Sequence, residues 1–156
     1  MGAPVVIGVG NEYRHDDGFG VAVVAELAFR AAHDDRLAGV RLRVNDGEPT
    51  RMLDAWSGAG LAVVVDVAPG QDGQIGRWQE VTLPDGLRPD PAAASGHGIG
   101  LNATIALAQA LDCMPQRLVV LVTFGGCFQV GAGLSAPVAA AIDPVADRIC
   151  TLVTGS

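Results

Sequence analysis

The stretch Leu61-Ala62-Val63-Val64-Val65-Asp66 decides the fold class of this chain, because it is the strongest candidate for a buried β-strand. A continuous apolar run of this length, rich in valine, is typical of a strand in a parallel sheet that helices cover on both faces. The run ends on a carboxylate, and burying a charge is costly unless it is paired, protonated or bound to a metal ion. Asp66 is therefore the first candidate for a functional residue.

Strands and helices are expected to alternate on both sides of this run. Further strands are predicted at residues 4–9, 40–44, 75–83 and 118–123, and helices at residues 18–32, 50–56, 99–111 and 135–152. The short connection before residue 75 leaves no room for a helical crossover, which suggests an antiparallel edge strand. In the last helix we expect Ser135 to form the N-cap and Pro144 to introduce a kink. The pattern predicts a single three-layer α/β domain over residues 1–156, in which helices cover both faces of a mostly parallel twisted sheet of about five strands.

Composition and charge argue against several classes of partner. Hydrophobic residues make up 49% of the chain and charged residues 17%, which suits a sheet covered on both faces. The formal net charge is −7 and the ten basic residues are scattered, so we expect no nucleic-acid partner. No apolar run approaches the length of a membrane span and the N-terminus lacks the pattern of a secretory signal, so we expect a soluble cytoplasmic protein.

Two patterns that often carry chemistry are incomplete in this sequence. Gly8-Val9-Gly10 follows the first expected strand, but the third glycine of the dinucleotide-binding fingerprint is replaced by Tyr13. A nucleotide-binding protein is therefore a distant alternative, and we expect no nucleotide cofactor. The three cysteines, Cys113, Cys127 and Cys150, are widely spaced and form no CxxC pair, which favours small buried side chains in a reducing compartment.

Three potential metal ligands, Asp17, Asp66 and His97, each lie at or just past the end of an expected strand or in a glycine-rich loop. Strand ends on one edge of an open α/β sheet converge on a crevice, so these residues can meet there. Two carboxylates and an imidazole can hold one divalent ion and leave coordination positions open. Each residue also has a structural alternative: Asp17, with its neighbour Asp16, can serve only to favour a helix N-terminus, and His97 can be an exposed loop histidine. His15 is a reserve ligand, whereas His33 is expected to be solvated.

Taken together and in order, the motifs resemble those of the hydrogenase maturation endopeptidases, which remove a C-terminal extension from the large subunit of nickel–iron hydrogenases. Any single motif is weak, but the combination is specific and covers nearly the whole chain. The matching motifs are Gly8-Val9-Gly10-Asn11, Asp16-Asp17-Gly18-Phe19-Gly20, Asp46-Gly47, Val65-Asp66-Val67, Ser95-Gly96-His97 with Gly100-Leu101, and Gly133-Leu134-Ser135.

The resemblance implies that Asp17, Asp66 and His97 bind a metal and carry the catalytic role, and that the metal is nickel already inserted in the large-subunit precursor. The first of these positions is often Glu in the family, so Asp17 shortens that arm by one methylene. Residues 84–98 would help to embrace the precursor. The sequence contains no H-E-x-x-H helix, so whether nickel only signals recognition or also takes part in catalysis stays open. The rival interpretation is a non-proteolytic metal-sensing chaperone or binding module for the same precursor.

Overall fold

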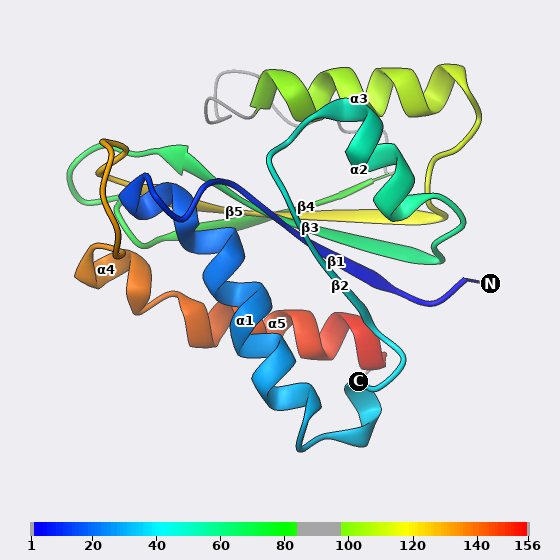
Figure 1. The fold of residues 1–156 in the computed structure, drawn as a ribbon, viewed down its shortest axis with the longest axis horizontal. Coiled ribbons are helices and arrows are strands. Elements are labelled where there is room, and N and C mark those ends of the chain that lie inside the picture. The colour runs from blue at the N-terminus through cyan, green and yellow to red at the C-terminus, as the bar shows by residue number, and fades with distance from the viewer. Residues whose placement is uncertain (1, 84–97, 156) are drawn as a thin grey trace.

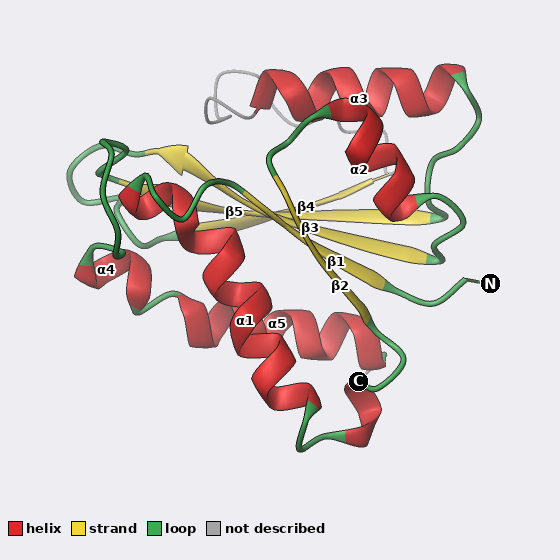
Figure 2. Ribbon diagram, in the orientation of Figure 1, coloured by secondary structure: helices red, strands yellow, loops and turns green. Residues whose placement is uncertain are grey.

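The computed structural model describes residues 2–83 and 98–155, which form one sheet with helices on both sides (Figures 1 and 2). The strands are β1 (Val5–Val9), β2 (Arg41–Asn45), β3 (Leu61–Pro69), β4 (Trp78–Leu83) and β5 (Arg117–Gly125). The α-helices are α1 (Phe19–Ala31), α2 (Pro49–Trp56), α3 (Gly98–Ala110), α4 (Ala136–Ala139) and α5 (Ile142–Thr154), and two short 3-10 helices are η1 (His15–Gly18) and η2 (Asp35–Leu37).

The five strands are arranged in the order β2-β1-β3-β5-β4. β1 pairs in parallel with β2 and β3, and β3 pairs in parallel with β5. β4 pairs with β5 in the antiparallel direction and lies at the edge of the sheet. The predicted mostly parallel sheet with an antiparallel edge strand is thus confirmed. The edge strand begins at Trp78 rather than at residue 75, because the chain first turns through Gly76, whose φ is +88° and whose N–H donates to the carbonyl of Phe124 at 2.8 Å.

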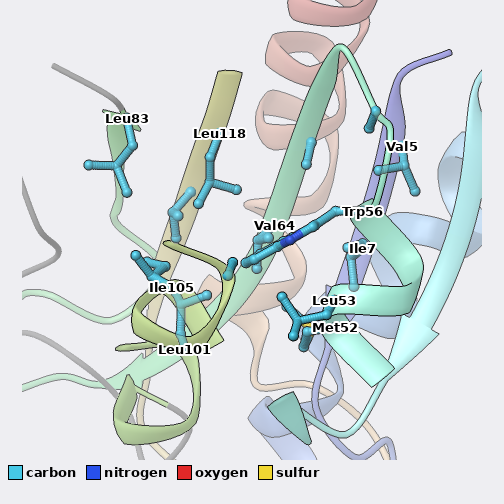
Figure 3. Packing of buried hydrophobic residues seen from close by; sticks show 14 of the residues in the cluster. Val5, Ile7, Met52, Leu53, Trp56, Val64, Leu83, Leu101, Ile105 and Leu118 are labelled. Atoms are coloured by element: carbon cyan, nitrogen blue, oxygen red, sulfur yellow. The ribbon is translucent and has the colours of Figure 1, made fainter. Parts of the chain in front are cut away.

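The helices form two layers, with α2 and α3 on one face of the sheet and α1, α4 and α5 on the other (Figure 1). In the first layer, Trp56 of α2 and Ile105 of α3 pack on the side chains of β1, β3 and β5 (Figure 3). In the second layer, Phe19 of α1 and Val145 of α5 pack on the opposite faces of the same strands. Within the described ranges, no helix is long and apolar enough to cross a membrane.

Burial on both faces explains the apolar sequence of β3. Ala62 and Val64 belong to the core under α2 and α3, whereas Val63, Val65 and Val67 belong to the core under α1 and α5. Full burial of one such valine stabilises the fold by about 1.5–3 kcal/mol. Because side chains alternate along a strand, Asp66 shares the α2/α3 side of the sheet with Ala62 and Val64.

Two predicted boundaries are wrong. β3 continues for three residues beyond Asp66, because Val67, Ala68 and Pro69 pair with the extended end of β5, so the carboxylate lies inside the strand and not at its end. The last helix is not one kinked helix but two, α4 and α5. The helix is interrupted at Ala140 and Ala141. Pro144 lies in the first turn of α5, where its missing N–H removes no intrahelical hydrogen bond.

An ion pair attaches the edge strand to the second helical layer. Arg148 of α5 donates from Nε and Nη2 to the two carboxylate oxygens of Glu80 on β4, at 2.6 and 2.9 Å. A bidentate pair of this kind fixes the orientation of both side chains. It therefore fixes the position of α5 relative to β4 at the edge of the sheet.

Candidate active site at the carboxyl edge of the sheet

Asp66 lies where the carboxyl ends of β1 and β3 run side by side. Gly8 of β1 is level with Val65 of β3, and Asp66 itself is level with Val122 of β5. The side chain is 4% exposed, and its Oδ1 accepts a hydrogen bond of 2.7 Å from the N–H of Val67. A buried carboxylate inside an otherwise apolar strand is costly, and the functional role of Asp66 stays a prediction.

Asp17 lies in η1, which contacts β3, and it is 1% exposed. Its Oδ2 accepts a hydrogen bond of 3.0 Å from the N–H of Asn11, and the same N–H lies 3.1 Å from the Asp17 carbonyl. The turn that permits this contact requires glycine at position 10, where φ is +142° and an added Cβ would lie 1.9 Å from the Asp17 carbonyl oxygen. The chain thus folds back directly after β1 and brings Asp17 to the carboxyl edge of the sheet.

The structure therefore places Asp17, in η1 after β1, and Asp66, inside β3, next to the carboxyl end of β1, and η1 contacts β3. His97 lies outside the described residues. Within residues 2–83 and 98–155, no three His, Cys, Asp or Glu side chains form a group that could hold a metal ion. Two buried carboxylates supply hard, anionic oxygen donors, and an imidazole would add the nitrogen that nickel and other divalent transition metals favour. The donor set fits a metal only if a third ligand joins the two carboxylates.

Asp16 has a role that the sequence did not reveal. It is fully buried and accepts hydrogen bonds from the N–H of Gly126 at 2.8 Å, of Cys127 at 3.1 Å and of Ser135 at 2.7 Å, and from the Ser135 hydroxyl at 2.9 Å. Burial raises the pKa of the Asp16 carboxyl, but these hydrogen bonds together outweigh burial and bring the pKa below its ordinary value of 3.8. Asp16 and Asp17 lie in η1, directly before α1, so they precede the helix as expected, and the first turn of α1 itself carries no acidic residue.

The predicted capping role of Ser135 is wrong. Ser135 occupies the N-cap position of α4, but its side chain caps no helical N–H and donates to Asp16 instead. The carboxylate of Asp16 is anionic, and hydrogen bonds to charged acceptors are stronger than those between neutral groups. Asp16 and Ser135 are 119 residues apart, so neither residue signals the pairing locally.

The remaining histidine and cysteine candidates are exposed or half-buried, and His15 has a positive φ of +48°. His15, the reserve ligand, places Nδ1 2.9 Å from the carbonyl oxygen of Gly133, so its ring lies against the loop after β5. His33 is exposed at the end of α1 and contacts the ring of Phe29. Cys127 is a half-buried free thiol whose N–H, not its sulfur, contacts Asp16.

Comparisons with known proteins identify the fold. No protein-family model matches the sequence, and no curated protein matches it significantly. Among solved structures, the hydrogenase maturating endopeptidase HybD from Escherichia coli is similar with a TM-score of 0.75 and 18% identity, over 94% of this chain and 89% of that chain. The [NiFe] hydrogenase maturation protease HybD from Thermococcus kodakarensis gives a TM-score of 0.73 at 18% identity, over 97% and 99% of the two chains. The hydrogenase 2 maturation peptidase from a Thaumarchaeota archaeon gives a TM-score of 0.69 at 24% identity, over 97% of each chain.

These similarities extend over almost the whole length of the chain, and they confirm at the level of the fold the resemblance that the sequence motifs predicted. This chain has the fold of the hydrogenase maturation proteases.

Proposed function

We propose that this chain is a cytoplasmic, metal-dependent endopeptidase that removes the C-terminal extension of a nickel–iron hydrogenase large-subunit precursor after nickel has been inserted. The observation that carries the proposal is the pair of buried carboxylates, Asp17 and Asp66, next to the carboxyl end of β1 in a fold shared with hydrogenase maturation proteases. Ligand and active sites of open α/β sheets lie at this edge.

In this proposal Asp17, Asp66 and His97 engage nickel that the precursor presents. The N–H groups of Asn11 and Val67 each hold one carboxylate oxygen in place, so the two side chains need little reorganisation when the metal arrives. Low-dielectric surroundings strengthen the attraction between a buried carboxylate and a cation. The metal enters with the substrate, and no nucleotide cofactor takes part.

Recognition of nickel would make cleavage a checkpoint on assembly of the hydrogenase active site. A partial set of ligands can contact a metal while its remaining ligands stay on the precursor. A precursor without nickel would lack the group that Asp17, Asp66 and His97 bind, so it would not be held in the cleavable position. The selectivity would then come from the metal rather than from the sequence around the scissile bond alone.

The test is intact mass spectrometry of a nickel-loaded large-subunit precursor, incubated with and without this protein, beside a nickel-free precursor. Loss of a C-terminal peptide from the loaded precursor only is the expected result. An unchanged mass despite stable association of the two proteins would refute the protease proposal and favour the metal-sensing chaperone. Equal cleavage of both precursors would refute the nickel checkpoint.

A further inference from the structure

η1 is too short to hold its own conformation, so the position of Asp17 must depend on contacts with other segments. It has four residues, about a single turn, and isolated turns of helix are unstable because nucleation costs more than one hydrogen bond returns. Besides α1, β3 and Asn11, the loop between β5 and α4, residues 126–135, contacts η1 and is a source of its order. Figure 1 shows this loop beside the blue N-terminal segment that contains η1.

The contacts between η1 and residues 126–135 include several backbone hydrogen bonds. The N–H of His15 donates to the carbonyl of Gly131 at 2.8 Å, and the N–H of Asp16 donates to the carbonyl of Cys127 at 2.9 Å. Gly131 in turn donates to the carbonyl of Tyr13 at 2.8 Å. These bonds align the two segments, but each joins neutral groups and is worth little once solvent competes.

The Asp16 side chain supplies most of the contacts that involve a charged group, and Arg14, the N-cap of η1, adds one from Nε to the carbonyl of Phe128 at 3.1 Å. The two oxygens of Asp16 receive four hydrogen bonds, from three backbone N–H groups and the Ser135 hydroxyl, and all four donors come from residues 126–135. An ionised carboxylate accepts only, so it matches a set made entirely of donors, whereas an amide would turn its NH₂ toward them. The loop thus forms a binding site for one carboxylate of its own chain.

Asp16 and Asp17 are adjacent in a 3-10 helix, so their side chains leave the helix in different directions. Asp16 turns to the loop after β5, and Asp17 turns to the N–H of Asn11 at the end of β1. We infer that Asp16 is a positioning residue, which anchors η1 to residues 126–135 and thereby holds the Asp17 carboxylate at the carboxyl edge of the sheet. The inference deepens the proposed function and rests on it for its effect on activity, but its effect on Asp17 can be measured separately.

The test compares Asp16→Asn with a matched control, Asp34→Asn. Asp34 also binds a backbone N–H at the start of a 3-10 helix, that of Arg36 at 3.0 Å, but it belongs to η2, which carries none of the proposed site residues. Two quantities are measured for each variant: kcat and KM for the nickel-loaded precursor, and hydrogen exchange of the Asn11 amide that donates to Asp17. Amides of β3 report global stability in the same exchange experiment.

We expect Asp16→Asn to lower kcat roughly tenfold or more and to accelerate exchange of the Asn11 amide by a similar factor, because losing hydrogen bonds to a charged group costs on that scale. Exchange of the β3 amides should change much less, and Asp34→Asn should change neither kcat nor Asn11. Loss of kcat without faster exchange at Asn11 would overturn the inference, and so would an unchanged Asn11 amide together with unchanged kcat.

Two further arrangements keep the test decisive. If Asp16→Asn does not fold, Ser135→Ala removes the hydroxyl donor and leaves the three backbone donors, so a smaller acceleration at Asn11 is expected, and none would overturn the inference. If the wild-type protein does not cleave the precursor, the proposed function fails, and exchange at Asn11 alone then decides whether Asp16 positions Asp17.

Discussion

Gly10→Ala, compared with a control variant, should separate a loss of cleavage caused by displacement of Asp17 from a loss caused by lower stability of the fold. At position 10 φ is +142°, and an added Cβ would lie 1.9 Å from the carbonyl oxygen of Asp17. Backbone strain of a non-glycine residue at such a φ costs about 1–3 kcal/mol. Relieving the overlap requires Asp17 or residue 10 to move by about 1.5 Å, the difference between 1.9 Å and an ordinary contact of about 3.4 Å.

The matched control is Gly73→Ala, in the turn before β4. Its φ is +88°, so it introduces strain of the same kind, but a Cβ there meets nothing within 4 Å. Both variants should lower the unfolding temperature by about 2–4 °C for each kcal/mol lost. Only Gly10→Ala should also lower processing of the nickel-loaded precursor, by about 100-fold, because a displacement of about 1 Å at a reacting centre costs on that order.

Thermal unfolding and a timed cleavage assay measure the two effects on the same samples. If Gly10→Ala cleaved the precursor at the rate of Gly73→Ala, the turn after β1 would not control the position of Asp17, and the account of this loop would be refuted.

Three further predictions concern single side chains. His97→Ala should stay soluble and folded but lose processing altogether, as seen by intact mass, and processing at the wild-type rate would remove His97 from the site. Hydrogen bonds from Arg148 hold the pKa of Glu80 below its ordinary value of 4.5, so this pair contributes stability above pH 4.5 that is lost as the pH falls through the folded-state pKa. In urea unfolding near neutrality, Glu80→Gln should therefore be about 0.5–1 kcal/mol less stable than wild type. This difference in the free energy of unfolding should shrink as the pH falls, and a difference that stays constant with pH would contradict the prediction. Trp56 is fully buried, and its Nε1 has no hydrogen-bond partner among residues 2–83 and 98–155. Trp56→Phe removes packing but also an unpaired N–H that costs about 1–3 kcal/mol, so the two effects on the free energy of unfolding should nearly offset. A loss above about 3 kcal/mol would mean that the N–H is satisfied.

The sequence predicts the sheet well because its signals are local. The valine run of β3 is buried on both faces, and no half-exposed strand or short loop would keep so many consecutive apolar residues. The antiparallel edge is predictable for an equally local reason, the short connection before β4. The end of β3 was misjudged because Asp66 interrupts the apolar run, although Val67 and Ala68 resume the burial on its far side.

The errors concern features that depend on distant contacts. The break between α4 and α5 falls in a run of alanines, Ala139 to Ala141, which favours helix and gives no sign of a turn, whereas the conspicuous Pro144 lies harmlessly in the first turn of α5. Asp16 looks like one of a pair of residues favouring a helix N-terminus, and only the fold shows that its partners lie beyond residue 125. Asp66 was singled out for the opposite reason, since a carboxylate in a buried apolar strand is anomalous where it stands.

If the proposed function holds, the carboxylates of Asp17 and Asp66 engage the nickel of the precursor. The most direct measurement is the intact mass of the nickel-loaded precursor after incubation with wild type, with Asp17→Asn and with Asp66→Asn, which keep the shape of each side chain and remove its charge. We expect loss of the C-terminal peptide with wild type and the uncut mass with either variant. Cleavage by both variants at the wild-type rate would contradict it.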